Sequence, residues 1–258
     1  MKPGTERDGC YPEKPSMLII NADDYGKDRF CTDRILSCFG KGNVTSASAM
    51  VFMTDSERSA ELALENGLDT GLHLNLSLGF SGDVRSQRLR ECHERLARFF
   101  SKSRYTTLVY NPLLTRHFEY VFNSEYEEYV RLYKKSPSHI DGHHHLHLCM
   151  NMMIDSIIPW GTKVRRNFTF WKGEKDVFNR LYRRIADRII KRRYDITDFF
   201  FDISPITQER VGQILDCAKT AVVELMVHPE REVEYNYLMH REVDGIMSVM
   251  QRGSFLDF

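Results

Sequence analysis

Histidines and acidic residues, the side chains that hold metal ions and move protons, gather at a few points of this sequence. Five of its ten histidines fall within residues 138–147, which read SHIDGHHHLH. If this run is extended, one face carries His139, Asp141, His143, His145 and His147. Imidazoles at that spacing suit a divalent ion, and a neighbouring carboxylate can orient a ligating imidazole. The run therefore favours metal binding, without telling which histidines bind.

Two adjacent carboxylates, Asp23 and Asp24, follow the apolar run MLII at 17–20. They would repel each other unless a cation or hydrogen-bond donors lay between them. A metal bound by one would leave the other ionised beside it as a base. A solvated turn is the alternative, and an isolated Asp-Asp pair favours it.

Two further histidines stand on or after predicted strands. His73 shares the polar face of strand 70–77 with Asn75, while the leucines point to the other face. Most single histidines on strands are structural, but this polar face could line a site. His228 ends the apolar strand VVELMV and precedes a proline, which favours an extended backbone. It could be a general acid near neutral pH or, with equal weight, a structural residue.

The elements that must position these residues alternate between strands and helices. This alternation predicts parallel strands in one α/β domain, whose sites form at the carboxyl ends of the strands. Strands are expected at 17–20, 44–52, 70–77, 138–148, 162–168, 196–203 and 221–227, and helices at 55–66, 86–101, 115–135, 177–193 and 207–219. Residues 1–16, with three Pro and two Gly, are expected to be a flexible tail and no secretory signal, which leaves 17–258 as a single catalytic domain.

Composition excludes several classes of function. Apolar residues make up 42% of the 258 residues and charged residues 28%, as in ordinary globular proteins. Thirty-six basic residues balance 36 acidic ones, which argues against a nucleic-acid partner. No run of about 18 apolar residues predicts a membrane span. Six scattered cysteines without a C-x-x-C pair favour reduced thiols and a cytoplasmic protein.

A basic stretch, residues 180–193, carries six Arg and one Lys against one Asp on an expected helix. A solvated helix packed on the domain is the favoured interpretation. A weak contact with an anionic membrane surface or a phosphorylated, lipid-linked sugar is the alternative. The sequence also leaves a homodimer open.

Five motifs, in order, carry a resemblance to a known family. NADDYG, NVTSASAMV, GLHLNLS, SHIDGHHHLH and ELMVHP, spread over roughly Met17–Pro229, resemble the YdjC-like carbohydrate deacetylases, which include chitooligosaccharide deacetylases. The resemblance implies a distorted (β/α) barrel, here with about seven parallel strands. It also implies a metal-dependent enzyme that removes acetyl groups from N-acetylated sugars, whether mono-, oligo- or lipid-linked saccharides.

Carried over residue by residue, the resemblance implies one divalent ion held by Asp24, His73 and His143, with Asp23 as general base and His228 as general acid. One Asp and two His suit zinc or another transition ion, whereas magnesium prefers oxygen ligands; the choice between Zn²⁺ and Mg²⁺ stays open. Further candidates that would contact the substrate or support the ligands are Asn75, Asp141, His145 and Arg165, the last with Arg166 as its alternative.

Two other functions remain as alternatives. A metallophosphoesterase also uses Asp and His clusters but usually needs two bridged metals. A non-catalytic sugar- or metal-binding regulator would need no base beside the metal, so the Asp23–Asp24 pair argues against it. The stretch between Leu78 and Ser138 carries no recognised motif, and it is expected to shape the sugar site.

Overall fold

A parallel sheet forms the centre of the protein in the computed structural model, which describes residues 16–258 except 172, 175–182, 184–185 and 241–249. Its six strands are ordered β4-β3-β2-β1-β6-β5, and every neighbouring pair is parallel. The strands are β1 (Met17–Tyr25), β2 (Ser46–Ala49), β3 (Asp69–Leu74), β4 (Ile140–Gly142), β5 (Phe199–Asp202) and β6 (Val222–Val227).

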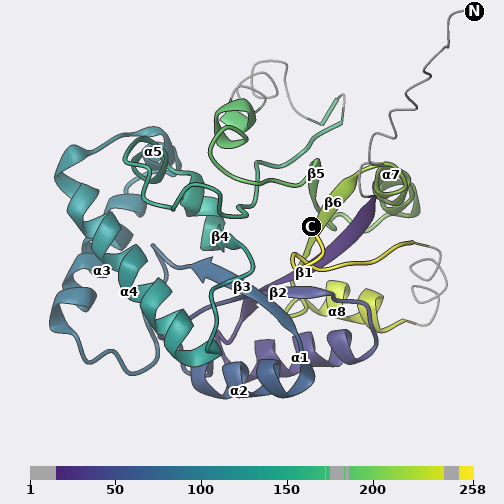
Figure 1. The fold of residues 1–258 in the computed structure, drawn as a ribbon, viewed down its shortest axis with the longest axis horizontal. Helices are drawn as coiled ribbons and strands as arrows, with labels where there is room; N and C mark the ends of the chain where they lie inside the picture. Colours follow the sequence, from purple (N-terminus) through teal and green to yellow (C-terminus); the bar gives the residue numbers. More distant parts are fainter. Residues whose placement is uncertain (1–15, 172, 175–182, 184–185, 241–249) are drawn as a thin grey trace, which may run out of the picture.

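Helices connect these strands and cover the outside of the curled sheet (Figure 1). The α-helices are α1 (Arg29–Gly40), α2 (Ser56–Asn66), α3 (Gln87–Phe100), α4 (Thr115–Tyr133), α5 (Met150–Ile154), α7 (Gln208–Ala218) and α8 (Glu232–Met239). Short 3₁₀ helices are η1 (Arg104–Leu108), η2 (Pro112–Leu114) and η3 (His143–Leu148). The predicted α/β fold class, a distorted barrel, is confirmed.

About seven strands were expected and the described part of the chain forms six, and the difference lies in segment 162–169. Its residues 162–168 were expected to be the fifth strand, but they make only isolated bridges. Its backbone nevertheless reaches both edges of the sheet. Ile140 N donates to Lys163 O at 2.8 Å, and Thr169 N donates to Phe200 O at 2.8 Å. Segment 162–169 therefore links β4 to β5 without forming a regular strand.

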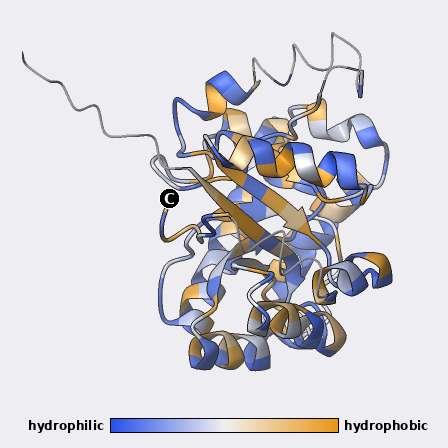
Figure 2. Cartoon of the chain, turned by 90° about the vertical axis from the view of Figure 1, so that its right-hand side faces the viewer, coloured by the Kyte–Doolittle hydropathy of each residue, from blue (hydrophilic) through white to orange (hydrophobic). Residues whose placement is uncertain are grey.

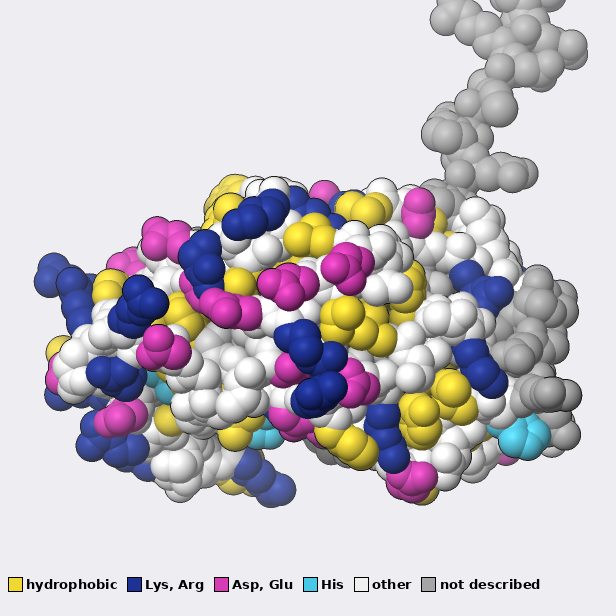
Figure 3. Space-filling view, turned by 90° about the horizontal axis from the view of Figure 1, so that it is seen from below, with side chains coloured by type: hydrophobic (Ala, Val, Ile, Leu, Met, Phe, Trp, Pro, Cys, Tyr) yellow, Lys and Arg dark blue, Asp and Glu magenta, His cyan; other side chains and the backbone are white. Residues whose placement is uncertain are grey.

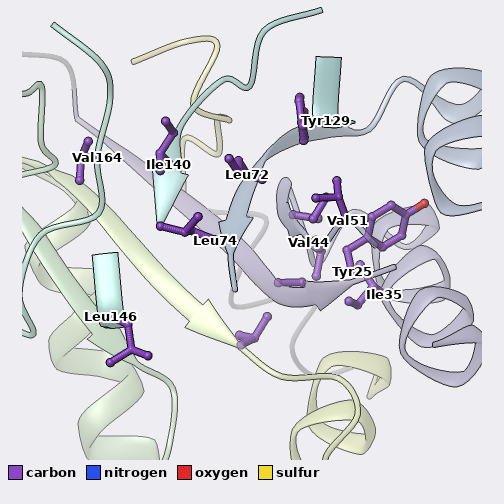
Figure 4. Packing of buried hydrophobic residues seen from close by; sticks show 14 of the residues in the cluster. Tyr25, Ile35, Val44, Val51, Leu72, Leu74, Tyr129, Ile140, Leu146 and Val164 are labelled. Carbon is purple, nitrogen blue, oxygen red and sulfur yellow. The ribbon is translucent and has the colours of Figure 1, made fainter. Parts of the chain in front are cut away.

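Side-chain alternation along β1 separates two apolar clusters. Leu18 and Ile20 belong to the main core, which also holds Ile35 of α1 and lies between the sheet and its helices (Figure 4). Ile19 packs instead with Met17, Val222 and Phe255 in a second cluster. Each fully buried side chain of this size contributes about 1.5–3 kcal/mol relative to its exposure to water. The apolar strands and the polar outer surfaces of the helices are visible in Figure 2.

The predicted helices at 55–66, 86–101, 115–135 and 207–219 are confirmed as α2, α3, α4 and α7. Gly67 ends α2 with φ 68°, a left-handed conformation that glycine adopts at little cost. Ser86 caps α3 by accepting a hydrogen bond from Leu89 N. Local capping signals therefore located these helix ends well.

The predicted strands were too long at two places that matter for the site. β3 ends at Leu74, because the Asn75 side chain accepts hydrogen bonds from the backbone of Ser77 and Leu78 and turns the chain. β4 ends at Gly142, after which the histidine run forms η3. Both turns occur at the carboxyl edge of the sheet.

Two other predicted features fall partly or wholly outside the described residues. The tail at 1–16 lies there except for its last residue, as do eight of the seventeen residues of the basic helix at 177–193, of which residues 186–190 are helical. Among the residues that are described, the helices are too short or too polar to cross a membrane.

Candidate active site

The acidic pair stands on an irregular stretch at the end of β1. The pairing of β1 with β2 shifts between Ala22 and Tyr25, and Asp24 has φ 68°. Such a bulge interrupts the alternation of the strand and re-aims its side chains. Gly26 follows with φ 83°, and a Cβ there would lie 2.6 Å from Ser59 Oγ, so this close turn requires glycine. As a result, Asp23 and Asp24 contact different partners.

Asp24 meets the two histidines that come from β3 and from the end of β4. Its Oδ1 lies 3.3 Å from His73 Nε2 and 3.0 Å from His143 Nδ1. One ligand atom from each of the three residues lies within 4.8 Å of the others, so the group has the geometry to hold a metal ion. Burial opposes the charge on Asp24, but the hydrogen bonds with His143 and His73 outweigh it and hold the Asp24 pKa well below its usual value.

His73 also has the supporting partner that metal-ligating histidines usually have. Its Nδ1 lies 2.8 Å from Asp141 Oδ1, which fixes the ring and leaves Nε2 directed at Asp24. Burial lowers the pKa of His73, but the Asp141 and Asp23 carboxylates raise it more, and the pKa lies well above its ordinary value. One carboxylate, two imidazoles and a carboxylate behind one imidazole fit a zinc-like ion.

Arg165, on segment 162–169, is fully buried and binds three carboxylates. Two of its nitrogens lie 2.7 and 2.8 Å from the two oxygens of Asp23, a bidentate pair. Its Nη1 is also 2.7 Å from Asp141 Oδ2, and its Nε is 2.7 Å from Glu224 Oε1. Planar guanidinium groups suit such bidentate binding. Arg165 therefore joins Asp23 to Asp141, the carboxylate that supports His73.

Arg166, the alternative for the predicted arginine, lies elsewhere. It contacts Asp187 and the backbone carbonyls of Thr197 and Asp198. Of the two adjacent arginines, Arg165 is the one that reaches the acidic pair.

His228 follows β6 and faces Asp23. Its Nε2 lies 4.0 Å from Asp23 Oδ2. Its backbone N donates to Glu234 Oε2 at 2.6 Å, which ties the residue to α8. Its Nδ1 is buried and has no hydrogen-bond partner among the described residues. His228 and Arg165 therefore both lie beside Asp23 Oδ2, and His228 Nε2 is the ring nitrogen that faces the acidic pair.

The five alternate residues of 139–147 do not form one face, because the chain turns after Gly142. His144 and His145 have φ 56° and 58°, so the backbone is left-handed at both. The His145 ring packs against Phe168 and Phe200, and His147 Nε2 lies 3.0 Å from Arg165 O. Burial lowers the pKa of His147 to about 4. Neither histidine belongs to the group around Asp24.

His139 also lies apart from that group. It is fully buried, with Nε2 3.1 Å from Ser48 Oγ and its ring stacked on Phe255. Asn75, predicted to contact substrate or support the ligands, hydrogen-bonds to its own turn, and its backbone N donates to Glu125 Oε2 at 2.8 Å. It shapes the loop after β3.

Sequence reasoning missed three residues that contact the site. Lys27 Nζ lies 3.1 Å from Asp24 Oδ2 and also pairs with Glu230. Glu224 binds Arg165, and burial raises its pKa to about 7. Ser48 donates to Asp141 Oδ2 at 2.8 Å. Two of them could have been found from the sequence: Glu224 is a lone acidic residue inside the apolar strand VVELMV, and Lys27 directly follows the NADDYG motif.

Comparisons with known proteins agree with this arrangement. The family described as YdjC-like protein matches residues 17–248. Carbohydrate deacetylase 2 of Listeria innocua is 34% identical over 127 residues, 49% of each chain. Chitooligosaccharide deacetylase of Enterobacter sp. (strain 638) is 28% identical over 278 residues, covering 93% of this chain and 98% of that one. The alignments with the first curated relatives span about half of their length.

A solved structure resembles the whole fold. The crystal structure of a protein from Enterococcus faecalis V583, described provisionally as a cellobiose-phosphate cleavage protein, has a TM-score of 0.69 and 18% identity. The match covers 95% of this chain and 99% of that one. At this identity the likeness shows the fold alone.

Proposed function

The chain belongs to the YdjC-like family, and from that premise we propose that it is a metal-dependent hydrolase that removes acetyl groups from N-acetylated sugars. The observation that carries the proposal is a pair of adjacent acids with separate partners. Asp24 faces His73 and His143, whereas Asp23 is held by Arg165. One acid is thus placed to bind a metal and the other to move a proton. The curated relatives named as carbohydrate deacetylases support this reading.

The ligands of the proposed ion are Asp24 Oδ1, His73 and His143. A divalent ion there, Zn²⁺ or Mg²⁺, would supply a Lewis acid that polarises the acetyl carbonyl and activates a water molecule. Asp141 orients His73 for this role through the 2.8 Å contact.

Asp23 is the proposed general base. Both of its oxygens accept hydrogen bonds from Arg165, so its position is fixed and its rotation is prevented. A fixed carboxylate next to the ligand group can take a proton from the attacking water. Arg165 positions this base and touches no substrate atom in the proposal.

His228 is the proposed general acid. Amide hydrolysis must deliver a proton to the leaving amine, and His228 Nε2 lies 4.0 Å from Asp23 Oδ2, on the rim of the same site. A substrate nitrogen beside His228 Nε2 would lie within reach of this histidine while the water lies near Asp23. Separate residues then handle the two proton transfers.

The test compares two isosteric variants, Asp23→Asn and Asp24→Asn. Acetate release is measured on N-acetylated mono-, oligo- and lipid-linked saccharides, with metal analysis of each protein. Asp23→Asn should lower turnover by about 10²–10⁴ and keep the metal, since that is the usual contribution of a general base. Asp24→Asn should lose the metal itself. Loss of metal from Asp23→Asn with retention in Asp24→Asn would reverse the two roles.

The same measurements separate the alternatives. Acetate release with one metal per chain supports the deacetylase. Phosphate release from phosphoesters with two metals per chain would replace it by a phosphoesterase. Metal and sugar binding without turnover of any acetylated saccharide would replace it by a binding protein.

A further inference from the structure

The connection between α3 and α4, residues 101–114, exposes a series of apolar side chains. The exposed fraction is 59% for Tyr105, 53% for Leu108, 49% for Val109 and 83% for Leu113. Scattered single apolar residues on a surface are ordinary, but a concentration within nine residues marks an interaction site. The two 3₁₀ helices η1 and η2 carry most of them.

The sequence around the 101–114 segment is basic. Between Arg95 and Phe118 the sequence has no Asp or Glu and five basic residues, namely Arg95, Arg98, Lys102, Arg104 and Arg116. All five are exposed. None of them makes an ion pair with an acidic residue in the described part of the chain. The chain as a whole has no net charge, so this positive charge is a local concentration.

Other parts of the surface look different. On the face shown in Figure 3, acidic and basic side chains are interspersed. Arg131, for example, pairs with both Glu57 and Glu128. In the described stretch 95–118, by contrast, exposed cations without acidic partners stand beside exposed apolar side chains.

Polar contacts hold the segment on the part of the chain that carries the site. Asn111 and Asn151 exchange two hydrogen bonds of 3.0 and 2.9 Å, and Tyr110 donates to Asp155 at 2.8 Å. Asn151 belongs to α5, which begins directly after the η3 turn that holds His143. Figure 1 shows the segment beside α5. A surface that binds the segment would consequently lie near the candidate active site.

We propose that the 101–114 segment docks the protein on an anionic lipid bilayer. Its tyrosine, leucine and valine side chains insert at the level of the headgroups, and the flanking arginines and lysine bind the lipid phosphates and carboxylates. The positive charge around the segment favours an anionic bilayer over a neutral partner or a second copy of this chain. A neutral apolar partner would not need five unpaired cations, and an apolar surface of a second copy would bring the same positive charges together.

The test is sedimentation of the full chain with vesicles of phosphatidylcholine alone or of phosphatidylcholine with phosphatidylserine. Binding to the anionic vesicles should be at least tenfold stronger, and 0.5 M salt should weaken it because salt screens the charges. A Lys102→Glu, Arg104→Glu, Arg116→Glu variant should bind no better to anionic than to neutral vesicles. Leu113→Ser should weaken binding several-fold.

Matched controls keep the result specific. Val233→Ser removes an apolar side chain that is 72% exposed on α8, and Lys219→Glu reverses a charge elsewhere. Both should bind vesicles like the parent. All variants should keep the parent's circular dichroism and its metal content, because no altered residue contacts the site. Equal binding to neutral and anionic vesicles, absence of binding, or a dimer that Leu113→Ser dissociates would each overturn the proposal. None of these outcomes depends on deacetylase activity.

Discussion

Replacing Arg165 by methionine tests the central electrostatic arrangement of this protein. The guanidinium contacts Asp23, Asp141 and Glu224 at 2.7–2.8 Å, and the exposed fraction of all four residues is below 5%. Methionine occupies a similar volume but leaves three buried acids without their common cation. Removing one partner of a buried ion pair typically costs about 3–5 kcal/mol. We expect a loss of at least this size in the free energy of unfolding at pH 8, a large fraction of a usual total.

The loss should depend on pH with a definite sign. Without Arg165, the folded-state pKa of Glu224 rises further above its unfolded value, because burial disfavours the charged form and the cation that lowers this pKa is gone. The folded protein then binds more protons than the unfolded chain, so stability falls as the pH rises. Even beside Arg165, burial raises the Glu224 pKa to about 7. The variant should therefore lose much less stability at pH 5 than at pH 8.

Urea unfolding followed by circular dichroism at pH 5, 6, 7 and 8 measures this difference. The matched control is Arg166→Met, which removes the neighbouring arginine and its single ion pair with Asp187. Acetate release by Arg165→Met, measured at pH 6 where it should fold, should fall at least 10²-fold, since Asp23 loses both of its hydrogen bonds. Equal losses of stability at pH 5 and pH 8, or a variant as stable as the parent, would refute the reasoning.

Three further predictions follow from the site and its surroundings. Burial lowers the pKa values of His139 and His147 to about 4, against 6.5 for an exposed histidine. Because the unfolded chain binds protons first, the free energy of unfolding should fall by on the order of 3 kcal/mol for each histidine between pH 6.5 and pH 4. Unfolding measured at graded pH checks this, and His147→Gln should make the pH dependence weaker. His228→Ala should slow hydrolysis of amides more than of activated acetyl esters, whose leaving groups need no proton; equal losses would make His228 a binding or structural residue. His73→Ala should lower metal content, whereas His145→Ala should leave it unchanged, as metal analysis would show.

The sequence predicted well what depends on the ends of parallel strands. Asp24 stood just past the expected strand 17–20, and His73 and His143 stood within the expected strands 70–77 and 138–148. The carboxyl ends of parallel strands bring such residues to one edge of a sheet. The alternation of β3 also separated His73 from its neighbouring leucines, which lie in the main core. These conclusions needed only the strand period and the strand direction, both of which the residue pattern carries.

The turn after Gly142 was not predictable from the same pattern. His144 and His145 both adopt the left-handed backbone conformation. Histidine adopts it more often than most residues do, but a run of three histidines does not by itself predict it. The turn moves His145 against Phe168 and away from Asp24. Lys27 was missed for a related reason, because its contact with Asp24 depends on the bulge in β1 and on Gly26.

The contacts of Arg165 show that the position of the candidate site residues depends on packing inside the barrel. Along one face of β1, Ile19 packs in the apolar cluster, Asn21 donates to Ser48 Oγ at 2.7 Å, and Asp23 binds Arg165. The same strand face thus passes from an apolar layer to a polar layer and then to the proposed base.

Glu224 of β6 is the register partner of Ile19, and its Oε1 contacts Arg165 Nε at 2.7 Å. A shift of β1 by one residue would turn Ile20 and Ala22 inward and leave Arg165 without Asp23. The irregular segment 162–169 must therefore place the Arg165 guanidinium at the one level along β1 where Asp23, Asp141 and Glu224 can all contact it. Because the neutralisation of three acids depends on this register, the position of the proposed base is fixed by the packing of the barrel interior and not by the loops around it.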